Sequence, residues 1–176
     1  FRASVDSLNI GETEYNYSLL AKKCGINMPE TRLFEGKYFG VERFDRTPEG
    51  KIHTISAAGL LNADYRIPSL DYSGLLKVCH NITRNMEEVY DLFRQMVFNI
   101  VIKNRDDHAK NFSFQLIGNE WKLSPAYDIL PSTGFGGDHT TTINKTGVQK
   151  ISDIPAIAVE VGLSKQRAKD IIKEVI

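Results

Sequence analysis

The sequence predicts an α+β fold built from β-hairpins and a helical body. Two stretches, residues 31–44 and 112–123, hold strand-like apolar runs separated by glycine-containing turns, as β-hairpins do. Between them, Met86 to Lys103 has apolar residues at helical spacing and becomes apolar nearly all round towards its end, which is typical of a helix at the centre of a domain. Two further helical stretches close the chain, and this mixture of hairpins and helices indicates the α+β class.

The first half of the chain is expected to form a helix, a hairpin and a short capped helix. Glu12 to Lys23 is predicted to be a helix that ends at Gly25, with Tyr15, Leu19, Leu20 and Cys24 on one face. The elements expected after it are strands 31–35 and 38–44, an extended piece over 51–55, and a short helix from the cap Ser56 to Leu61.

The second half is expected to hold the core. A helix over 71–82 is predicted to direct Leu75, Leu76, Val78 and Cys79 inward. The later elements are the helix 86–103, strands 112–117 and 120–123, and closing helices 151–161 and 164–176. Residues 131–147 are rich in glycine and poor in apolar side chains, so we expect this segment to be the most mobile.

Composition excludes several classes of protein. The 176 residues are 41% hydrophobic and 25% charged, as in ordinary globular domains. Lys plus Arg and Asp plus Glu both number 22, so bulk charge favours neither nucleic acid nor membrane binding. Cys24 and Cys79 give neither a disulfide framework nor a zinc spacing, which indicates reduced thiols in a cytoplasmic protein. The apolar run 96–102 is too short to span a membrane.

A polar loop separates the central helix from the second hairpin. Residues 104–111 are dense in charged and amide groups, yet apolar segments flank them on both sides. Burying or half-burying such groups without partners is costly, so a ligand, a metal or an ion-pair network is expected to account for them. The groups in question are Asp106, Asp107, His108, Lys110 and Asn111.

Two carboxylates from this region are expected to converge. Asp106 follows the central helix and Asp128 follows the second hairpin, whose path returns the chain on itself. Carboxylates about 4 Å apart repel by roughly 4 kcal/mol at an effective dielectric near 20, a cost that a divalent cation or protonation of one group offsets. Asp and Asn oxygens favour Mg²⁺. Asp106 and Asn111 stand five apart, as do the base and the metal-binding Asn of kinases, which makes Asp106 the candidate base and Asn111 with Asp128 the candidate metal ligands.

Three motifs in order closely resemble the HipA-like toxin kinases. They are Val41-Glu42-Arg43-Phe44-Asp45-Arg46, Asp106-Asp107-His108-Ala109-Lys110-Asn111-Phe112-Ser113 and Leu123-Ser124-Pro125-Ala126-Tyr127-Asp128-Ile129. These relatives are Ser/Thr protein kinases of bacterial toxin–antitoxin systems, with a fold related to phosphatidylinositol kinases. The resemblance runs from about Glu12 to at least Ser132.

The resemblance implies a kinase-like architecture and a set of site residues. Residues 1–44 would be a remnant of the N-lobe, a helix with a hairpin, and residues 45–176 the helical C-lobe. It implies ATP and Mg²⁺ as cofactors, with Asp106 as catalytic base and Asn111 and Asp128 as metal ligands. The residues implied to contact ATP are the hinge segment Glu42, Arg43 and Phe44, then His108, Ala109, Lys110, Asn111, Tyr127 and Asp128.

The resemblance also implies partners. Family substrates tend to belong to the translation machinery, notably aminoacyl-tRNA synthetases, and the usual partner is a helix-turn-helix antitoxin through which DNA is met indirectly; no membrane is involved. Family members carry a Gly-rich phosphate loop and an ATP-binding Lys, neither of which is found in these 176 residues. The phosphates would lack their main cationic anchor, so these residues alone are expected to be inactive or nearly so.

Other interpretations stay open at this point. The chain could be a non-catalytic nucleotide- or protein-binding module, or a metal-dependent phosphohydrolase that uses Asp106, His108 and Asp128. Plainer roles also exist for single residues. Both Asp106 and Asp128 could form turns, His108 could brace the loop, and Lys110 could pair with Asp107. Asn111 could simply enter the strand, Tyr127 could serve packing, and Glu42 with Phe44 could be the two faces of a strand.

Overall fold

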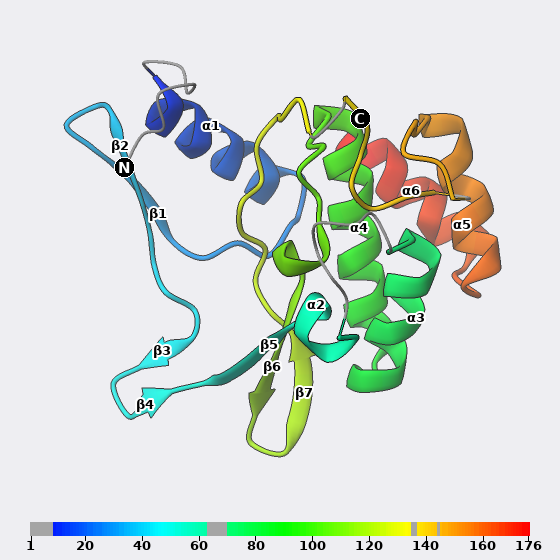
Figure 1. Ribbon diagram of the computed structural model, residues 1–176, viewed down its shortest axis with the longest axis horizontal. Coiled ribbons are helices and arrows are strands. Elements are labelled where there is room, and N and C mark those ends of the chain that lie inside the picture. The colour runs from blue at the N-terminus through cyan, green and yellow to red at the C-terminus, as the bar shows by residue number, and fades with distance from the viewer. Residues whose placement is uncertain (1–8, 63–69, 135–136, 144) are drawn as a thin grey trace.

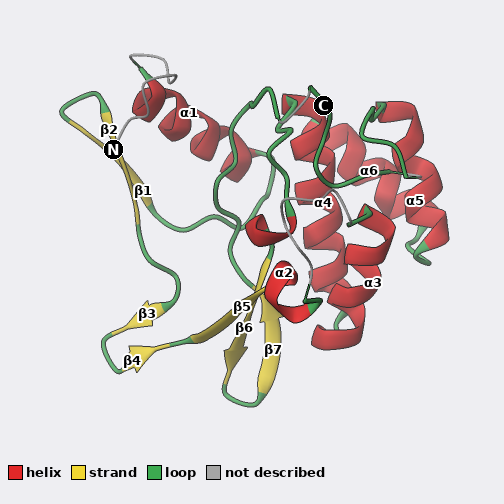
Figure 2. Ribbon diagram, in the orientation of Figure 1, coloured by secondary structure: helices red, strands yellow, loops and turns green. Residues whose placement is uncertain are grey.

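The helices after α2, Ala57–Leu60, gather on one side of the molecule, while the strands and the first helix lie on the other (Figures 1 and 2). Residues 9–62, 70–134, 137–143 and 145–176 are described in this computed structural model. The mixture of helices with small antiparallel sheets confirms the α+β class. No helix within these ranges is long and apolar enough to cross a bilayer.

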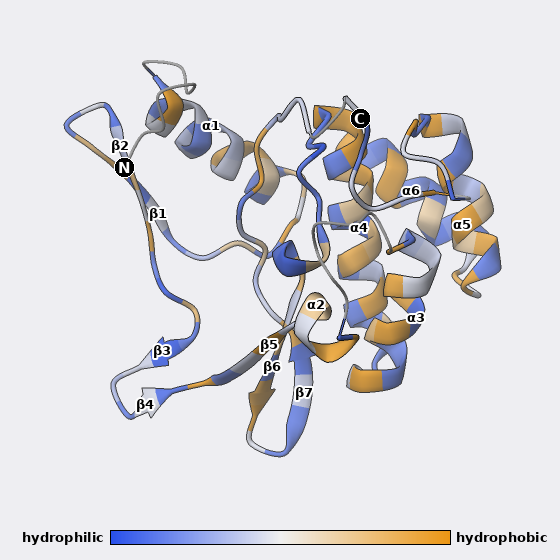
Figure 3. Ribbon diagram, viewed as in Figure 1, coloured by the Kyte–Doolittle hydropathy of each residue, from blue (hydrophilic) through white to orange (hydrophobic). Residues whose placement is uncertain are grey.

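Helix α4, Met86–Ile102, is the centre of the core, as its apolar pattern predicts. It packs against α3, Tyr72–Thr83, and α6, Lys165–Val175, while α5, Ile154–Glu160, contacts both α3 and α6. The side chains of Leu92, Phe93 and Met96 are completely buried. Apolar residues, drawn in orange, cover much of α3 and α4 in Figure 3. This helical body therefore provides the rigid support on which the polar loop after α4 rests.

A three-stranded antiparallel sheet carries the second hairpin. The strands β5, His53–Ser56, β6, Ser113–Ile117, and β7, Glu120–Leu123, lie in the order β5-β6-β7. The expected hairpin over 112–123 is confirmed, with Gly118 in the left-handed region at its turn. Phe114 faces Ile55 on one side and Leu123 on the other, and it is fully buried. The sheet thereby places the start of β6, next to the polar loop, against the core.

The first helix packs differently from the prediction. Helix α1, Ile10–Lys23, contacts the hairpin of β1, Thr31–Phe34, and β2, Tyr38–Val41. Its buried residues are Gly11, Ser18 and Ala21, whereas Leu19 and Leu20 of the predicted apolar face are exposed and Cys24 is partly buried. Small residues form the contact because they let the helix approach the hairpin backbone closely: a Cβ atom added at Gly11 would lie 2.1 Å from the carbonyl oxygen of Lys37.

Short elements connect these parts. Strand β2 ends at Val41 rather than at residue 44, so Glu42 and Phe44 are not the two faces of a strand. The side chain of Ser56 caps the short helix α2 by accepting a hydrogen bond from the Gly59 amide at 3.2 Å, as predicted. The remaining short elements are β3, Arg46–Thr47, β4, Gly50–Lys51, α2, Ala57–Leu60, and the 3-10 helices η1, Ala109–Asn111, and η2, Ile151–Asp153.

Candidate active site

The polar loop begins where α4 stops. Lys103 adopts a left-handed conformation with φ 58°, and the amide of Asn104 donates to the carbonyl oxygen of Asn99 at 2.8 Å. The chain then runs through residues 105–108 into η1 and enters β6 at Ser113. A buried helix, a short loop and a sheet strand therefore hold these polar side chains at the edge of the core, as the sequence pattern predicts.

Asp106 lies at the surface of this loop. Its side chain is 56% exposed, and its Oδ1 atom is 3.8 Å from Nε2 of His108. Partial burial raises the pKa of Asp106; the His108 charge opposes this, and the charges of Asp128 and Asp107 add to it. The net result is a pKa above the ordinary value. A carboxylate with a raised pKa is a better proton acceptor, as a general base requires.

Asp128 comes from the segment after β7 and reaches the same place. Its backbone is left-handed, with φ 56°, and the side-chain amide of Asn104 donates to its carbonyl oxygen at 3.3 Å. The charge of Asp128 contributes to the raised pKa of Asp106. The structure thus brings together the ends of α4 and of the second hairpin.

Asn111 lies at the end of the polar loop and binds the main chain of Asp106. It is buried at the end of η1, and its side-chain Nδ2 donates to the main-chain oxygen of Asp106 at 2.8 Å. Its Oδ1 atom is a ligand of the type that Mg²⁺ prefers, as are the oxygens of Asp128. The described residues include no group of three or more His, Cys, Asp and Glu side chains that could hold a metal. The available oxygens fit Mg²⁺, which commonly uses one or two protein carboxylates together with substrate phosphates.

Glu42, Arg43 and Phe44, for which the resemblance implies a hinge role, border a separate cavity of about 360 Å³. The rings of Phe44 and Tyr127 contact each other there, with centroids 5.5 Å apart. The carbonyl oxygen of Phe44 accepts a hydrogen bond from Nε2 of Gln115 at 3.0 Å, which ties the connecting segment to β6. The Arg43 guanidinium binds both carboxylate oxygens of Asp45, at 2.8 and 2.6 Å. The full lining is Val41, Glu42, Arg43, Phe44, Asp45, Thr54, Ser113 and Tyr127.

Tyr127 connects this cavity to the polar loop. Its hydroxyl donates to the carbonyl oxygen of Lys110 at 2.5 Å and accepts from the hydroxyl of Ser113, also at 2.5 Å. Burial raises the pKa of Tyr127, so the phenol stays protonated and able to donate. Of the other loop residues, Ala109 is buried, His108 is half-buried and Lys110 is exposed. Tyr127 therefore links this cavity to the loop that carries Asp106.

Comparison with known proteins identifies the family. The model of the HipA-like C-terminal domain matches residues 2–176. The chain belongs to this family. The HipA-like domain is also similar to “Putative kinase Y4dM” of Sinorhizobium fredii (strain NBRC 101917 / NGR234), at 26% identity over 191 residues, covering 95% of this chain and 46% of that protein.

Two more matches support the assignment. “Putative kinase Y4mE” of the same organism is 29% identical over 138 residues, covering 70% of this chain and 33% of that protein. Among solved structures, HipA of Shewanella oneidensis MR-1, in a complex with HipB and its operator DNA, superposes with a TM-score of 0.79 at 19% identity. That match covers 98% of this chain and 47% of the HipA chain, and it shows a shared fold. The HipA-like domain thus spans less than half the length of each of these three proteins.

Several residues of the HipA-like domain were missed by sequence reasoning. The carboxylate of Asp107, for which Lys110 was one candidate partner, is instead bonded by Tyr72, His139 and the backbone amides of residues 140 and 141. His139 gave no informative spacing, and the segment 131–147 was expected to be mobile. Its described residues around His139 are hydrogen-bonded to the loop that carries Asp106. The run of three threonines after His139 was an unusual feature of this segment in the sequence, but it does not indicate which residues the segment contacts.

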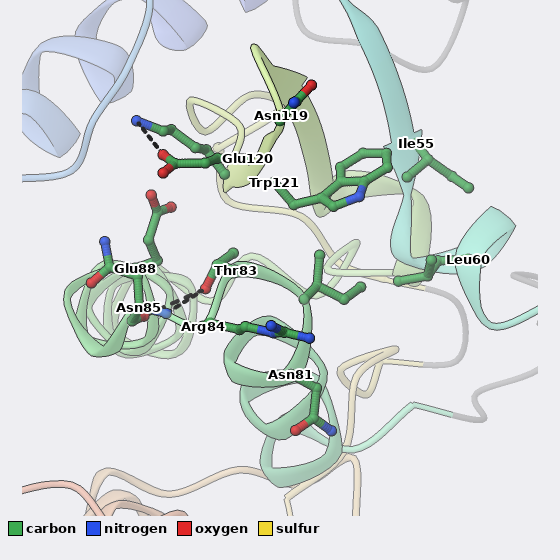
Figure 4. A pocket seen from close by; sticks show the side chains of 12 residues that line it. Ile55, Leu60, Asn81, Thr83, Arg84, Asn85, Glu88, Asn119, Glu120 and Trp121 are labelled. Atoms are coloured by element: carbon green, nitrogen blue, oxygen red, sulfur yellow. Dashed lines mark hydrogen bonds and ion pairs between the residues drawn. The ribbon is translucent and has the colours of Figure 1, made fainter.

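Another cavity of the HipA-like domain lies away from Asp106 and Asp128. It measures about 840 Å³ and lies between the turn that joins α3 to α4 and the sheet strands β5 and β7. Figure 4 shows Trp121 and Ile55 above this space and Arg84 and Asn81 below it. Neither Asp106 nor Asp128 lines it. This cavity is therefore separate from the carboxylate site.

Proposed function

We propose that this domain is the catalytic part of a Ser/Thr protein kinase, which transfers the γ-phosphate of ATP to a protein. The observation that supports this most is that Asn111 binds the main chain of Asp106 while Asn104, at the start of the same loop, binds the main chain of Asp128. Phosphoryl transfer needs a group that orients the attacking hydroxyl and charges that stabilise the phosphates. A kinase-like division into residues 1–44 and 45–176 is part of the same proposal.

Asp106 is the proposed base. Its side chain is exposed enough to reach a substrate hydroxyl, and its raised pKa favours acceptance of the hydroxyl proton. Asn111 and Asp128 would hold Mg²⁺, which when bound offsets the negative charge of the phosphates. Asn111 has a second task, since its amide fixes the main-chain carbonyl of the base.

The cavity at the hinge is the proposed nucleotide site. Backbone groups of Glu42, Arg43 and Phe44, which border this cavity, would contact the adenine. The Arg43 side chain would not, because its guanidinium binds Asp45. Tyr127 would form one wall, with its ring against Phe44. His108, Ala109 and Lys110 would line the path from this cavity to Asp106 and its neighbours.

The proposal extends to partners and substrate. We propose a helix-turn-helix antitoxin as partner, with DNA met through it, because the Shewanella relative is described in a complex with HipB and operator DNA. A protein of translation, such as an aminoacyl-tRNA synthetase, is the proposed substrate, and the cytoplasm the proposed location. The Gly-rich loop and ATP-binding Lys of the family have no match in these 176 residues. We therefore propose that residues 1–176 alone hydrolyse or transfer little ATP.

The proposal predicts that Asp106→Asn in the full-length protein lowers phosphoryl transfer at least ~100-fold, because the general base is lost. Autophosphorylation with ATP and Mg²⁺, followed by transfer of radiolabelled γ-phosphate, measures this. ATP binding by calorimetry should change little. The matched control is Asp170→Asn on α6, where the carboxylate accepts only a surface hydrogen bond from Gln166. Near-normal transfer by the Asp106 variant contradicts the role of Asp106 as base, and a parent protein that shows no Mg²⁺-dependent transfer contradicts the kinase proposal and favours a binding module.

A further inference from the structure

The residue after the proposed base is buried and saturated with hydrogen bonds. The Asp107 side chain is completely inaccessible. Its Oδ1 atom accepts from the amides of Thr140 and Thr141, at 2.9 and 3.1 Å. Its Oδ2 atom accepts from the Tyr72 hydroxyl at 2.8 Å and from Nδ1 of His139 at 3.0 Å. Four donors from two distant segments therefore converge on one carboxylate.

A buried carboxylate lowers the stability of the fold unless all of its hydrogen bonds are made. A buried carboxylate without partners loses several kcal/mol of hydration, and removal of one partner leaves an uncompensated polar group. A carboxylate has two oxygens that only accept, which matches four donors, whereas an Asn side chain at the same place would direct two hydrogens at them. Burial and the nearby Asp107 charge raise the pKa of Tyr72 well above its ordinary value, so its hydroxyl keeps the proton that it donates.

The same segment fixes the backbone around Asp106. The amide and the hydroxyl of Thr140 both donate to the carbonyl oxygen of Arg105, at 3.3 and 3.1 Å. The hydroxyl of Thr141 donates to the carbonyl oxygen of Asp107. Since Asn111 binds the carbonyl oxygen of Asp106, three successive carbonyls are held by three different side chains. The backbone that presents Asp106 therefore has little freedom to rotate.

A chain of hydrogen bonds continues from Asp107 to the other carboxylate. The Tyr72 hydroxyl accepts from Nδ2 of Asn99 at 3.3 Å, and Oδ1 of Asn99 accepts from Nδ2 of Asn104 at 3.2 Å. The second hydrogen of that Asn104 amide reaches the carbonyl oxygen of Asp128 at 3.3 Å. Both Asn99 and Asn104 are buried. One polar network thus fixes the backbones of both Asp106 and Asp128.

We propose that Asp107 is a positioning residue, which acts through Tyr72, His139 and the Asn99–Asn104 pair to hold Asp106 and Asp128 at a fixed separation. This inference rests on the proposed kinase function. Asp107 is inaccessible, so it acts without touching nucleotide or substrate. Small displacements of a reacting group are expensive: a shift of about 1 Å can cost roughly 100-fold in rate. Loss of the network should consequently slow the reaction while leaving ATP binding nearly intact.

The first test is Asp107→Asn in the full-length protein, with kcat and the KM for ATP measured from autophosphorylation with ATP and Mg²⁺. The variant should lose at least ~10-fold in kcat while its KM stays within about threefold, the pattern of an interaction needed in the transition state. Asp138→Asn is the matched control, since this neighbouring carboxylate is exposed. A variant that melts at a lower temperature but keeps the parental kcat while folded overturns the inference.

The second test guards against a variant that does not fold. His139→Ala removes one donor, and His139→Asn restores it, because the Asn amide nitrogen occupies nearly the place of the imidazole Nδ1. We expect kcat to fall in the Ala variant and to recover at least severalfold in the Asn variant; equal activities of the two overturn the inference. Asp106→Asn separates the two proposals. If it abolishes transfer while the residue 107 and 139 variants stay active, positioning by Asp107 fails and the kinase proposal stands.

Discussion

Tyr127 shows how a single side chain links two parts of the candidate site. Its ring contacts Phe44 at the hinge cavity, while its hydroxyl bridges Lys110 and Ser113 at the polar loop. The ring and the hydroxyl thus serve different contacts. An aromatic side chain of this kind combines a large apolar surface with a polar end that needs a partner when buried.

Replacement of Tyr127 by Phe should separate these contributions. The ring contact with Phe44 remains, but the carbonyl oxygen of Lys110 and the Ser113 hydroxyl lose their shared partner. We expect a loss of about 1–2 kcal/mol in the free energy of unfolding, measured by urea denaturation, with little change in ATP affinity. Tyr38→Phe on the exposed hairpin is the control and should cost less than ~0.5 kcal/mol. A tenfold loss of ATP affinity in the Tyr127 variant would assign the hydroxyl to the nucleotide instead.

For single residues, contacts between residues close in the sequence could be predicted, whereas contacts between distant segments were missed. Asp106 and Asn111 are five apart and share one loop, so their contact follows from spacing. Asp128 could be placed because a hairpin returns the chain. His139 meets Asp107 across 32 positions through an irregular segment, and no periodicity predicts such a contact.

At the scale of elements, Asp71 joins a helix cap to a distant segment. Its Oδ1 accepts from the amide of Ser73 at the start of α3, and its Oδ2 accepts from the Thr142 hydroxyl and the Lys145 amide. Burial acts to raise the pKa of Asp71, but these hydrogen bonds outweigh it and hold the pKa below its ordinary value. The cap therefore anchors the segment that also binds Asp107.

Because the pKa of Asp71 is lower in the folded chain than in the unfolded chain, its contribution is fully present above the ordinary Asp pKa and is lost as the pH falls through the folded value. Asp71→Ala should lower the free energy of unfolding by about 1–2 kcal/mol at neutral pH, and the difference should narrow between about pH 5 and pH 2. Ser164→Ala removes the uncharged cap of α6, so its cost should stay constant. A constant cost for the Asp71 variant would contradict the assigned cause.

Most elements could be predicted because their signals are local. Ser56 and Ser164 cap the helices that they were expected to start, and Gly118 makes the expected hairpin turn. The face of α1 was wrong for a physical reason: Leu19 and Leu20 have the more apolar side chains, yet the hairpin comes so close that only small residues fit beneath it. Apolarity predicts burial, but it does not predict the distance between two backbones.

For the whole molecule, α1 packs on the hairpin β1–β2, and these elements lie on the side of the molecule opposite helices α5 and α6 (Figure 1). A cavity of about 280 Å³ separates α1 from the segment around Asp128, with Glu14 and Ser18 on one wall and Asp128 to Leu130 on another. The connection from β2 to the helical body passes through the hinge residues. The position of α1 therefore determines the width of the space beside Asp128.

Replacing Gly11 by Ala tests this arrangement, because the close approach predicts a loss of stability where helix propensity alone predicts a gain. Alanine in a helix normally stabilises by about 0.5–1 kcal/mol relative to glycine. At Gly74 in α3 a Cβ meets nothing within 4 Å, so Gly74→Ala should give that gain. At Gly11 a Cβ would lie 2.1 Å from the Lys37 carbonyl oxygen and 3.0 Å from the Phe39 nitrogen, both backbone atoms that cannot rotate away.

Gly11→Ala should accordingly destabilise by at least ~1 kcal/mol, since overpacking outweighs helix propensity. Hydrogen exchange on the full-length protein should then show faster exchange over α1 and β1–β2, with α4 and α6 unchanged, because the overlap concerns only the contact between helix and hairpin. The same variant should weaken ATP–Mg²⁺ binding if α1 shapes the space beside Asp128. A stabilising Gly11→Ala, equal to Gly74→Ala, would mean that α1 and the hairpin do not approach as closely as the buried Gly11, Ser18 and Ala21 require.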